Sequence, residues 1–405
     1  MKMNDNNIKN EVSNCESCIT KPCQIGCPLS NDTTGFIKLS KKKQYKKAYK
    51  LLLETTVLPS VCGRICPHEK QCQGMCVKGV SYKEVEIGKI EAYIGDLAIE
   101  NKWKIDTDKN IENHNKKIAV IGGGPSGLTC AAFLAKRGYS VTIYEKHNYL
   151  GGLLFHGIPE FRLDKITLEN SIKKILDLGV KVYINQELGR DYTLEELENK
   201  YDAIFLGIGA NISRKMNIEG EQLEGVYGGN EILENKTHPN YEGKKVVISG
   251  GGNVAIDVAR TVKRMGAKEV TVIYRRSEKE MPAEPKEIEE AKSENIKFLF
   301  KTNMLKILGN KLVEKIECIK TELIKKEDEV RLSPVNVEGS NFFMDVDYVI
   351  MAVGSKPETK LLQSLNLELT NYKYIKINTN FQTSNPKVFA GGDVAGTKAT
   401  VAWAC

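Results

Sequence analysis

The chain has 405 residues, of which 41% are hydrophobic and 27% charged, and its net charge is +7. A chain of this length can bury two or three hydrophobic cores. No apolar run approaches the roughly 20 residues of a membrane helix, and the polar first ten residues do not resemble a secretory signal. These features exclude a membrane protein and favour a large cytoplasmic enzyme.

Eight of the eleven cysteines lie in two groups before residue 80. Thiolates at such short spacings ligate iron–sulfur clusters, and a proline after the last cysteine is frequent in these runs. Disulfides are disfavoured, because no signal segment precedes the groups and the remaining chain has only Cys130, Cys318 and Cys405. Structural zinc usually joins two CxxC-like pairs across a longer gap. The pattern therefore indicates an electron-transfer module, with the cysteines Cys15, Cys18, Cys23, Cys27, Cys62, Cys66, Cys72 and Cys76.

A lysine-rich run, residues 41–47, lies on a segment whose apolar residues have helical spacing. The simplest interpretation is a solvated helix face. A docking surface for an acidic partner protein is the alternative. Nothing else in the sequence suggests nucleic-acid binding.

The first dinucleotide-binding pattern begins with an apolar strand at Lys117–Ile121, followed by Gly122-Gly-Gly-Pro-Ser-Gly127. A helix is predicted over 128–137, and a second strand over 140–144 ends at Glu145. In this unit the glycines allow a tight turn and the close approach of a pyrophosphate. The helix N-terminus attracts the phosphates, and the acid accepts hydrogen bonds from the ribose hydroxyls. The complete unit predicts a dinucleotide site.

The same pattern recurs, with a strand over 244–249, the turn Gly250-Gly-Gly-Asn-Val-Ala255, a helix over 255–264 and a strand over 270–274. Arg275 stands where the first unit has Glu145. Arginines at this point can bind a 2′-phosphate that a carboxylate would repel. We therefore predict that the first unit binds FAD and the second binds NADPH through Arg275 and Arg276, unless these are ordinary surface arginines.

Near the chain end, a strand at Lys387–Ala390 leads into Gly391-Gly392-Asp393, and a helix is expected from Thr397 onward. The acid is expected to hold the ribityl–phosphate arm of the flavin, and the helix to direct its positive end toward the ring. Because the helical pattern stops at Cys405 without a cap, we expect the chain to be truncated there.

These motifs together resemble the small (beta) subunit family of NADPH-dependent glutamate synthase. Its relatives include the large subunit of NADH-dependent ferredoxin:NADP oxidoreductase and the N-terminal half of dihydropyrimidine dehydrogenase. The resemblance spans the chain and is carried by the cysteine groups, EIGKIEAY at 86–93, GGGPSGL, GGLLFHGIPEFRL at 151–163, GGGNVAID, YRRSEKEMPA and FAGGDV.

The resemblance implies two interleaved 4Fe–4S clusters. Cys15, Cys18, Cys23 and Cys76 would ligate the outer one, and Cys27, Cys66, Cys72 and Glu91 the inner one. Cys62 would then be a spare thiol, and a solvated helix carboxylate is the alternative for Glu91. The implied cofactor-binding residues, for FAD and NADPH together, are Gly122, Gly124, Pro125, Ser126, Gly127, Glu145, Gly152, Leu153, Arg162, Gly209, Gly250, Gly252, Asn253, Val254, Ala255, Arg275, Arg276, Gly354, Gly392 and Asp393.

The expected fold is α/β, with two Rossmann-like domains after an α-helical iron–sulfur domain. We predict that domain over 1–112, the FAD domain over 113–240 and 355–405, and the NADPH domain over 241–354. The expected activity passes electrons from NADPH through FAD to the clusters and a partner, without an acid–base catalyst. The partner is either a larger amidotransferase/FMN subunit, for L-glutamate synthesis, or a small flavoprotein and ferredoxin, as in a bifurcating transhydrogenase. A third possibility is an electron-carrier subunit without turnover of its own.

Overall fold

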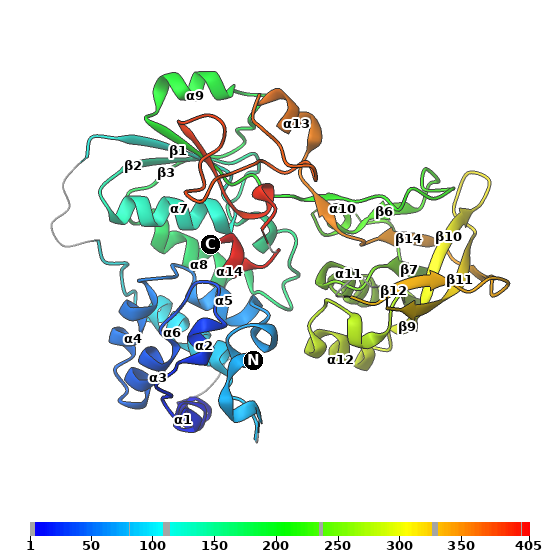
Figure 1. Ribbon diagram of the computed structural model, residues 1–405, viewed down its shortest axis with the longest axis horizontal. Helices are drawn as coiled ribbons and strands as arrows, with labels where there is room; N and C mark the ends of the chain where they lie inside the picture. The colour runs from blue at the N-terminus through cyan, green and yellow to red at the C-terminus, as the bar shows by residue number, and fades with distance from the viewer. Residues whose placement is uncertain (1–4, 81, 108–113, 235–237, 326–330, 398) are drawn as a thin grey trace. The chain divides into compact units, whose positions relative to one another are not determined.

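The computed structural model describes residues 5–80, 82–107, 114–234, 238–325, 331–397 and 399–405 (Figure 1). The chain divides into two compact units: residues 1–210 with 357–405, and residues 211–356. Within the described ranges, no helix is both long and apolar enough to cross a bilayer.

The N-terminal module of the first unit is helical, because its segments each bury one apolar face. Phe36 is 1% exposed within α3, whose N-terminus is capped by the carboxylate of Asp32. Helices α5 and α6 cross closely at Gly63, where a Cβ would lie 2.4 Å from the amide nitrogen of Ala92. The helices are α1 Asp5–Asn14, α2 Pro22–Ile25, α3 Thr33–Lys41, α4 Tyr45–Leu52, α5 Pro59–Ile65 and α6 Ile87–Glu100, with the 3-10 turns η1 His68–Lys70, η2 Gln73–Met75 and η3 Val77–Val80.

The rest of the first unit is a parallel sheet of five strands in the order β16-β4-β1-β2-β3. Successive residues of β1 face opposite sides, so that Val120 joins the core of the helical module and Ile121 joins the core beneath α9 and α13. Helices α7 and α8 lie on the first side and α9 on the other (Figure 1). The strands are β1 Lys117–Ile121, β2 Ser140–Tyr144, β3 Lys181–Tyr183, β4 Ala203–Leu206 and β16 Val388–Ala390; the helices are α7 Pro125–Lys136, η4 Gly152–Leu154, α8 Lys165–Leu176, α9 Leu194–Lys200, α13 Thr359–Ser364, η6 Gly392–Ala395 and α14 Val401–Ala404.

The second unit has its own parallel sheet, in the order β6-β14-β7-β8-β9, and an antiparallel sheet of β10, β11, β12 and β13. Strands β5 and β15 form a separate pair. The strands are β5 Ile212–Ser213, β6 Val226–Gly228, β7 Lys245–Ser249, β8 Glu269–Tyr274, β9 Lys297–Phe300, β10 Thr302–Leu308, β11 Lys315–Ile324, β12 Ser333–Asn336, β13 Phe342–Asp345, β14 Tyr348–Met351 and β15 Ser355–Lys356; the helices are α10 Gly229–Glu234, α11 Asn253–Arg264, η5 Glu278–Glu280 and α12 Pro285–Ser293.

The structure differs from the predicted boundaries in three places. The second unit begins at 211, ahead of the predicted 241, because β6 pairs with β14 and β5 with β15. The lysine-rich segment forms two helices, with a break after Lys41. The last helix begins at Val401, and Thr400 caps it, rather than at Thr397. The predicted boundary between 112 and 113 lies outside the described residues.

Candidate cluster and nucleotide-binding sites

One pocket of the helical module brings together cysteines from both sequence groups. Cys15, Cys18 and Cys23 line it together with Cys76, and α3 contributes Thr33, Thr34 and Ile37 to its wall. Burial raises the pKa of Cys23, and the charges of Cys15 and Cys76 raise it further. Four soft sulfur donors around one pocket fit the ligand set of a 4Fe–4S cluster.

A second group forms deeper in the module around Glu91, which is 5% exposed on α6. Burial and the charge of Cys62 raise the pKa of Glu91. Burial, followed by the charge of Glu91, raises the pKa of Cys72. Burial likewise raises the pKa of Cys27, with Glu91 as a further cause. Burial and mutual repulsion thus disfavour the charged forms of these groups, and a cationic iron centre would favour those forms by compensating their charge.

Cys62, expected to be a spare thiol, lies against this second group rather than apart from it. It shares hydrogen bonds with the thiols of Cys405 and Cys66, which lower the pKa of Cys62. Its sulfur also lies 3.6 Å from Oγ1 of Thr56. Sequence reasoning missed Cys405, and no sequence signal could have found it, because α14 meets α5 only through the fold.

The first glycine-rich turn has the geometry of a phosphate-binding turn. Gly122 has a φ of +100°, and a Cβ on Gly127 would lie 1.9 Å from the carbonyl oxygen of Gly122. A Cβ on Gly124 would meet only Gly152 Cα, at 3.9 Å, so the turn is open at this point. Pro125 and Ser126 begin α7, whose N–H groups are available to an anion. The cradle therefore fits a pyrophosphate.

Glu145 lies at the end of β2 and is 4% exposed. Its Oε2 accepts a hydrogen bond from the amide of Gly123 at 2.6 Å, and Oε1 accepts one from the amide of His147 at 2.9 Å. The carboxylate thus joins the strand end to the turn. Each of its oxygens keeps one lone pair that can accept a hydrogen bond from a ribose hydroxyl.

The loop after β2 is fastened to the same turn. The amide of Gly151 donates to the carbonyl of Gly123 at 2.8 Å. Beyond it, Leu153 lies in η4 and Arg162 closes a turn on Pro159. These contacts place the 151–162 segment beside the dinucleotide turn.

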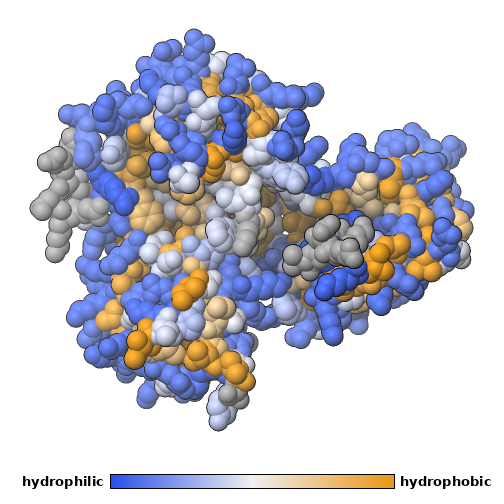
Figure 2. Space-filling model, viewed as in Figure 1, coloured by the Kyte–Doolittle hydropathy of each residue, from blue (hydrophilic) through white to orange (hydrophobic). Residues whose placement is uncertain are grey.

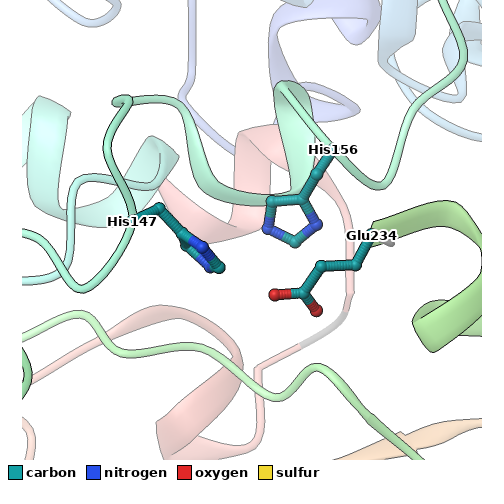
Figure 3. A group of neighbouring side chains, drawn as sticks. All are labelled: His147, His156 and Glu234. Atoms are coloured by element: carbon teal, nitrogen blue, oxygen red, sulfur yellow. The ribbon is translucent and has the colours of Figure 1, made fainter. Parts of the chain in front are cut away.

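Aromatic rings rigidify this loop. The rings of His147 and His156 have centroids 5.2 Å apart (Figure 3). Tyr149 stacks on His147 at 5.1 Å and on Phe155 at 4.1 Å. Glu234, also drawn in Figure 3, belongs to α10 of the second unit.

The end of the chain returns to the first turn. Gly392 packs on Ser126, because a Cβ there would lie 3.0 Å from the Ser126 Cβ. Oδ1 of Asp393 is buried without a hydrogen-bond partner among the described residues. Burial raises the pKa of Asp393 to about 6. An orphaned buried carboxylate oxygen beside the pyrophosphate cradle fits the expected contact with a flavin. Gly209, with a φ of +72°, follows β4 and has open space around it.

The second glycine-rich turn repeats this geometry. A Cβ on Gly250 would lie 2.2 Å from the carbonyl oxygen of Ala352, whereas one on Gly252 would meet nothing nearer than 4.0 Å. Oδ1 of Asn253, at the start of α11, accepts the amide of Glu284 at 3.0 Å. The next two helical positions hold Val254 and the fully buried Ala255.

Arg275 and Arg276 follow β8 directly, at the carboxyl edge of the second sheet. Nε of Arg276 donates to the carbonyl of Leu332 at 2.9 Å, which orients its guanidinium. The side chain of Arg275 is exposed. Gly354, with a φ of +121°, packs against Arg214. The edge therefore holds two guanidinium groups beside a phosphate-type turn.

Comparison with known proteins covers both parts of the chain. The sequence model of the family "Dihydroprymidine dehydrogenase domain II, 4Fe-4S cluster" matches residues 1–103. That of "Pyridine nucleotide-disulphide oxidoreductase" matches residues 116–404, and also 93–165. The small chain of NADPH-dependent glutamate synthase from Escherichia coli is 36% identical over 95% of this chain and 86% of its own length. The chain belongs to the family of NADPH-dependent glutamate synthase small chains.

As a member of the glutamate synthase small-chain family, the protein is a flavin-dependent NAD(P)H oxidoreductase with a 4Fe–4S domain. The small chain from Azospirillum brasilense is 32% identical over 100% of this chain and 87% of its own length. Subunit beta of the NADP⁺-dependent formate dehydrogenase of Moorella thermoacetica is 34% identical over 93% of this chain, but over only 57% of its own length. FprA of Mycobacterium tuberculosis shares the fold, at 20% identity and a TM-score of 0.63 over 71% of this chain and 82% of its own.

Proposed function

We propose that this glutamate synthase small-chain relative takes electrons from NADPH and delivers them, through FAD and two 4Fe–4S clusters, to a partner subunit. The observation that carries the proposal is that cysteines of the two sequence groups lie together in the fold. Cys76 shares a pocket with Cys15, Cys18 and Cys23, and Cys27 lies with Glu91 and the second group. Two neighbouring cluster sites of this kind suit a relay of single electrons.

FAD, when bound, accepts two electrons as a hydride and releases them singly, which joins NADPH chemistry to one-electron clusters. The residues of the chain would bind and orient these cofactors. Arg275 and Arg276 would hold the 2′-phosphate, Asp393 the ribityl arm, and the buried cysteines with Glu91 the iron. Hydride transfer needs stacked rings and dry surroundings, so no side chain is assigned as an acid or base.

The partner that we favour is a larger amidotransferase/FMN subunit, which would use the electrons for L-glutamate synthesis. The support is that the E. coli and A. brasilense relatives carry the glutamate synthase name. A second candidate, a subunit of another NADPH-linked electron-transfer complex, is supported by the relatives in formate dehydrogenase and in the NADPH-Fe(3+) oxidoreductase of Geobacter sulfurreducens.

An anaerobic NADPH titration followed by absorbance and electron paramagnetic resonance tests the electron path. We expect flavin bleaching and then cluster signals from the same sample. Flavin reduction without any cluster reduction, even with a stronger reductant, would contradict the relay. Affinity purification of the native complex identifies the partner: a large amidotransferase supports the first candidate, and a formate dehydrogenase or other oxidoreductase subunit supports the second.

A further inference from the structure

Helix α3, which contributes to the wall of the outer cysteine pocket, belongs to a strongly basic segment. Residues 33–53 contain no aspartate or glutamate, but they contain the seven lysines Lys38, Lys41, Lys42, Lys43, Lys46, Lys47 and Lys50. All seven are exposed. Lys50 pairs with Asp106 at 2.7 Å, and Nζ of Lys41 donates to the carbonyl of Cys15. The described residues contain no salt bridge to the other five, so their charge is uncompensated.

Helix α3 connects this basic face to the electron-transfer site. Helix α3 supplies Thr33, Thr34 and Ile37 to the wall of the pocket that holds Cys15, Cys18, Cys23 and Cys76. The bond from Lys41 to Cys15 fixes the end of α3 to the first cysteine loop. Lys38 and Lys41 therefore lie on a helix that also lines the outer cluster site, and α4 packs on that helix.

Exposed apolar side chains lie close in sequence to the cysteines of this pocket, and one of them, Val77, lines it. Ile19 is 99% exposed, Ile25 75%, Val77 43% and Val80 89%, and all four lie within a few residues of the cysteines. Orange surface gathers at the lower end of this unit in Figure 2, next to the blue surface of the polar helices. Glu16, which also lines the pocket, pairs with Lys78 at 3.6 Å, so the charge left over beside the exposed apolar side chains is positive. This combination is typical of a protein docking site.

We propose that this face is the docking site for a separate, acidic one-electron carrier protein, distinct from a permanently bound subunit. The inference rests on the proposed function. Permanent interfaces are depleted in lysine, whereas charge-steered, short-lived redox encounters use complementary charged surfaces. Nucleic acid fits less well, because it binds basic grooves with exposed aromatic platforms. Here Phe36 is 1% exposed, Tyr49 is 2% exposed and Tyr45 packs on Tyr93.

The reaction balances with two carriers: NADPH and two oxidised carriers give NADP⁺, one proton and two reduced carriers, or the reverse. A reduced acidic ferredoxin is a suitable probe, since it drives the reaction toward NADPH. The test uses the full chain with its cofactors under anaerobic conditions.

The first variant reverses three lysines, Lys42→Glu, Lys46→Glu and Lys47→Glu. Lys46 and Lys47 lie in the first turn of α4, where acidic residues suit the helix dipole, so folding should survive. The matched control, Lys268→Glu, Lys311→Glu and Lys325→Glu, makes the same change in charge on exposed positions of the second unit.

Carbodiimide cross-linking to ferredoxin, mapped by mass spectrometry, reports docking independently of activity. We expect cross-links on α3 and α4 that the first variant loses and the control keeps. We also expect kcat/KM for ferredoxin at low salt to be at least about tenfold lower in the first variant alone. At high salt the kcat/KM values of this variant and of the native protein should become equal.

Three outcomes would overturn the proposal: cross-links confined to other surfaces, equal losses in both variants, or tight binding of native protein to duplex DNA that the first variant abolishes. NADPH-dependent reduction of menadione, a neutral acceptor, should be unchanged in both variants. If the native protein does not reduce menadione, the proposed function itself is contradicted. Failure of the docking proposal is thereby distinguished from failure of the proposed function.

Discussion

Nδ2 of Asn31 lies 3.5 Å from Oε1 of Glu91, in the buried interior of the helical module. The two residues come from distant segments, and Asn31 follows Cys27 closely in the sequence. The amide is directed toward a carboxylate that lies among the inner cysteines. This contact is weak, at the outer limit for a hydrogen bond, and by itself it does not offset the burial of a carboxylate charge.

The first prediction concerns Glu91 as an iron ligand. Glu91→Ala should remove or perturb the inner cluster and slow electron flow beyond the flavin, because the inner site then lacks its fourth ligand. NADPH reduction of FAD should survive. Electron paramagnetic resonance of the reduced protein measures the cluster directly.

Cys62→Ser is the matched control for this prediction, since Cys62 occupies the same buried group. It should leave both clusters intact. If instead Cys62→Ser destroys a cluster and Glu91→Ala has no effect, Cys62 is the ligand and the interleaved assignment fails.

The second prediction concerns metal content. Anaerobically purified protein should contain about eight iron and eight acid-labile sulfide per chain, as two 4Fe–4S clusters require. Soft thiolates in a reducing compartment favour such clusters. Elemental and sulfide analysis provides the measurement, and stoichiometric zinc without sulfide would refute it.

The third prediction concerns cofactor preference. Replacing Arg275 and Arg276 by alanine should raise the KM for NADPH far more than that for NADH, because each charge-assisted hydrogen bond to phosphate contributes about 1.5–3 kcal/mol. That corresponds to about 10- to 150-fold for each bond. Arg275→Ala alone is the cleaner variant, because Arg276 also holds Leu332. Equal effects on both cofactors would show that the arginines do not recognise the 2′-phosphate.

The fourth prediction concerns Asp393, whose pKa burial raises from 3.8 to about 6. A raised pKa in the folded state favours the protonated acid, so its contribution to stability is complete below about pH 4 and is lost as the pH rises through 6. The loss is about 3 kcal/mol at most. In FAD-free protein, Asp393→Asn should therefore raise the melting temperature more at pH 7 than at pH 4.5.

The same substitution should weaken FAD binding if Asp393 holds the ribityl arm. Fluorescence titration of the FAD-free protein gives the affinity. A variant that is stabilised equally at both pH values would contradict the ionisation argument, and unchanged FAD affinity would contradict the flavin contact.

The fifth prediction concerns the crossing of α5 and α6. Gly63→Ala should destabilise the helical module by about 1–3 kcal/mol, because the new methyl group would overlap the backbone of Ala92. Gly79→Ala is the control, since its Cβ would make an ordinary contact with Glu84 at 3.6 Å. Denaturant unfolding followed by cluster absorbance compares the two; equal midpoints would show that the crossing can relax.

The sequence alone determined the local units. Both glycine turns, their flanking strands β1, β2, β7 and β8, and the acid or arginine after the second strand are found where they were predicted, within one or two residues. This succeeds because strand, turn and helix signals act over short stretches of chain. The prediction of thiolate ligands for iron–sulfur clusters likewise depends only on the number and spacing of the cysteines.

Only the tertiary structure decided how distant segments meet. It brings Cys405 against Cys62 and residues 211–240 into the second unit. Such contacts depend on strand pairing and on the packing of buried helix faces across long separations. The hydrophobic pattern of a segment shows that one face is buried, but it does not show which distant segment packs on that face.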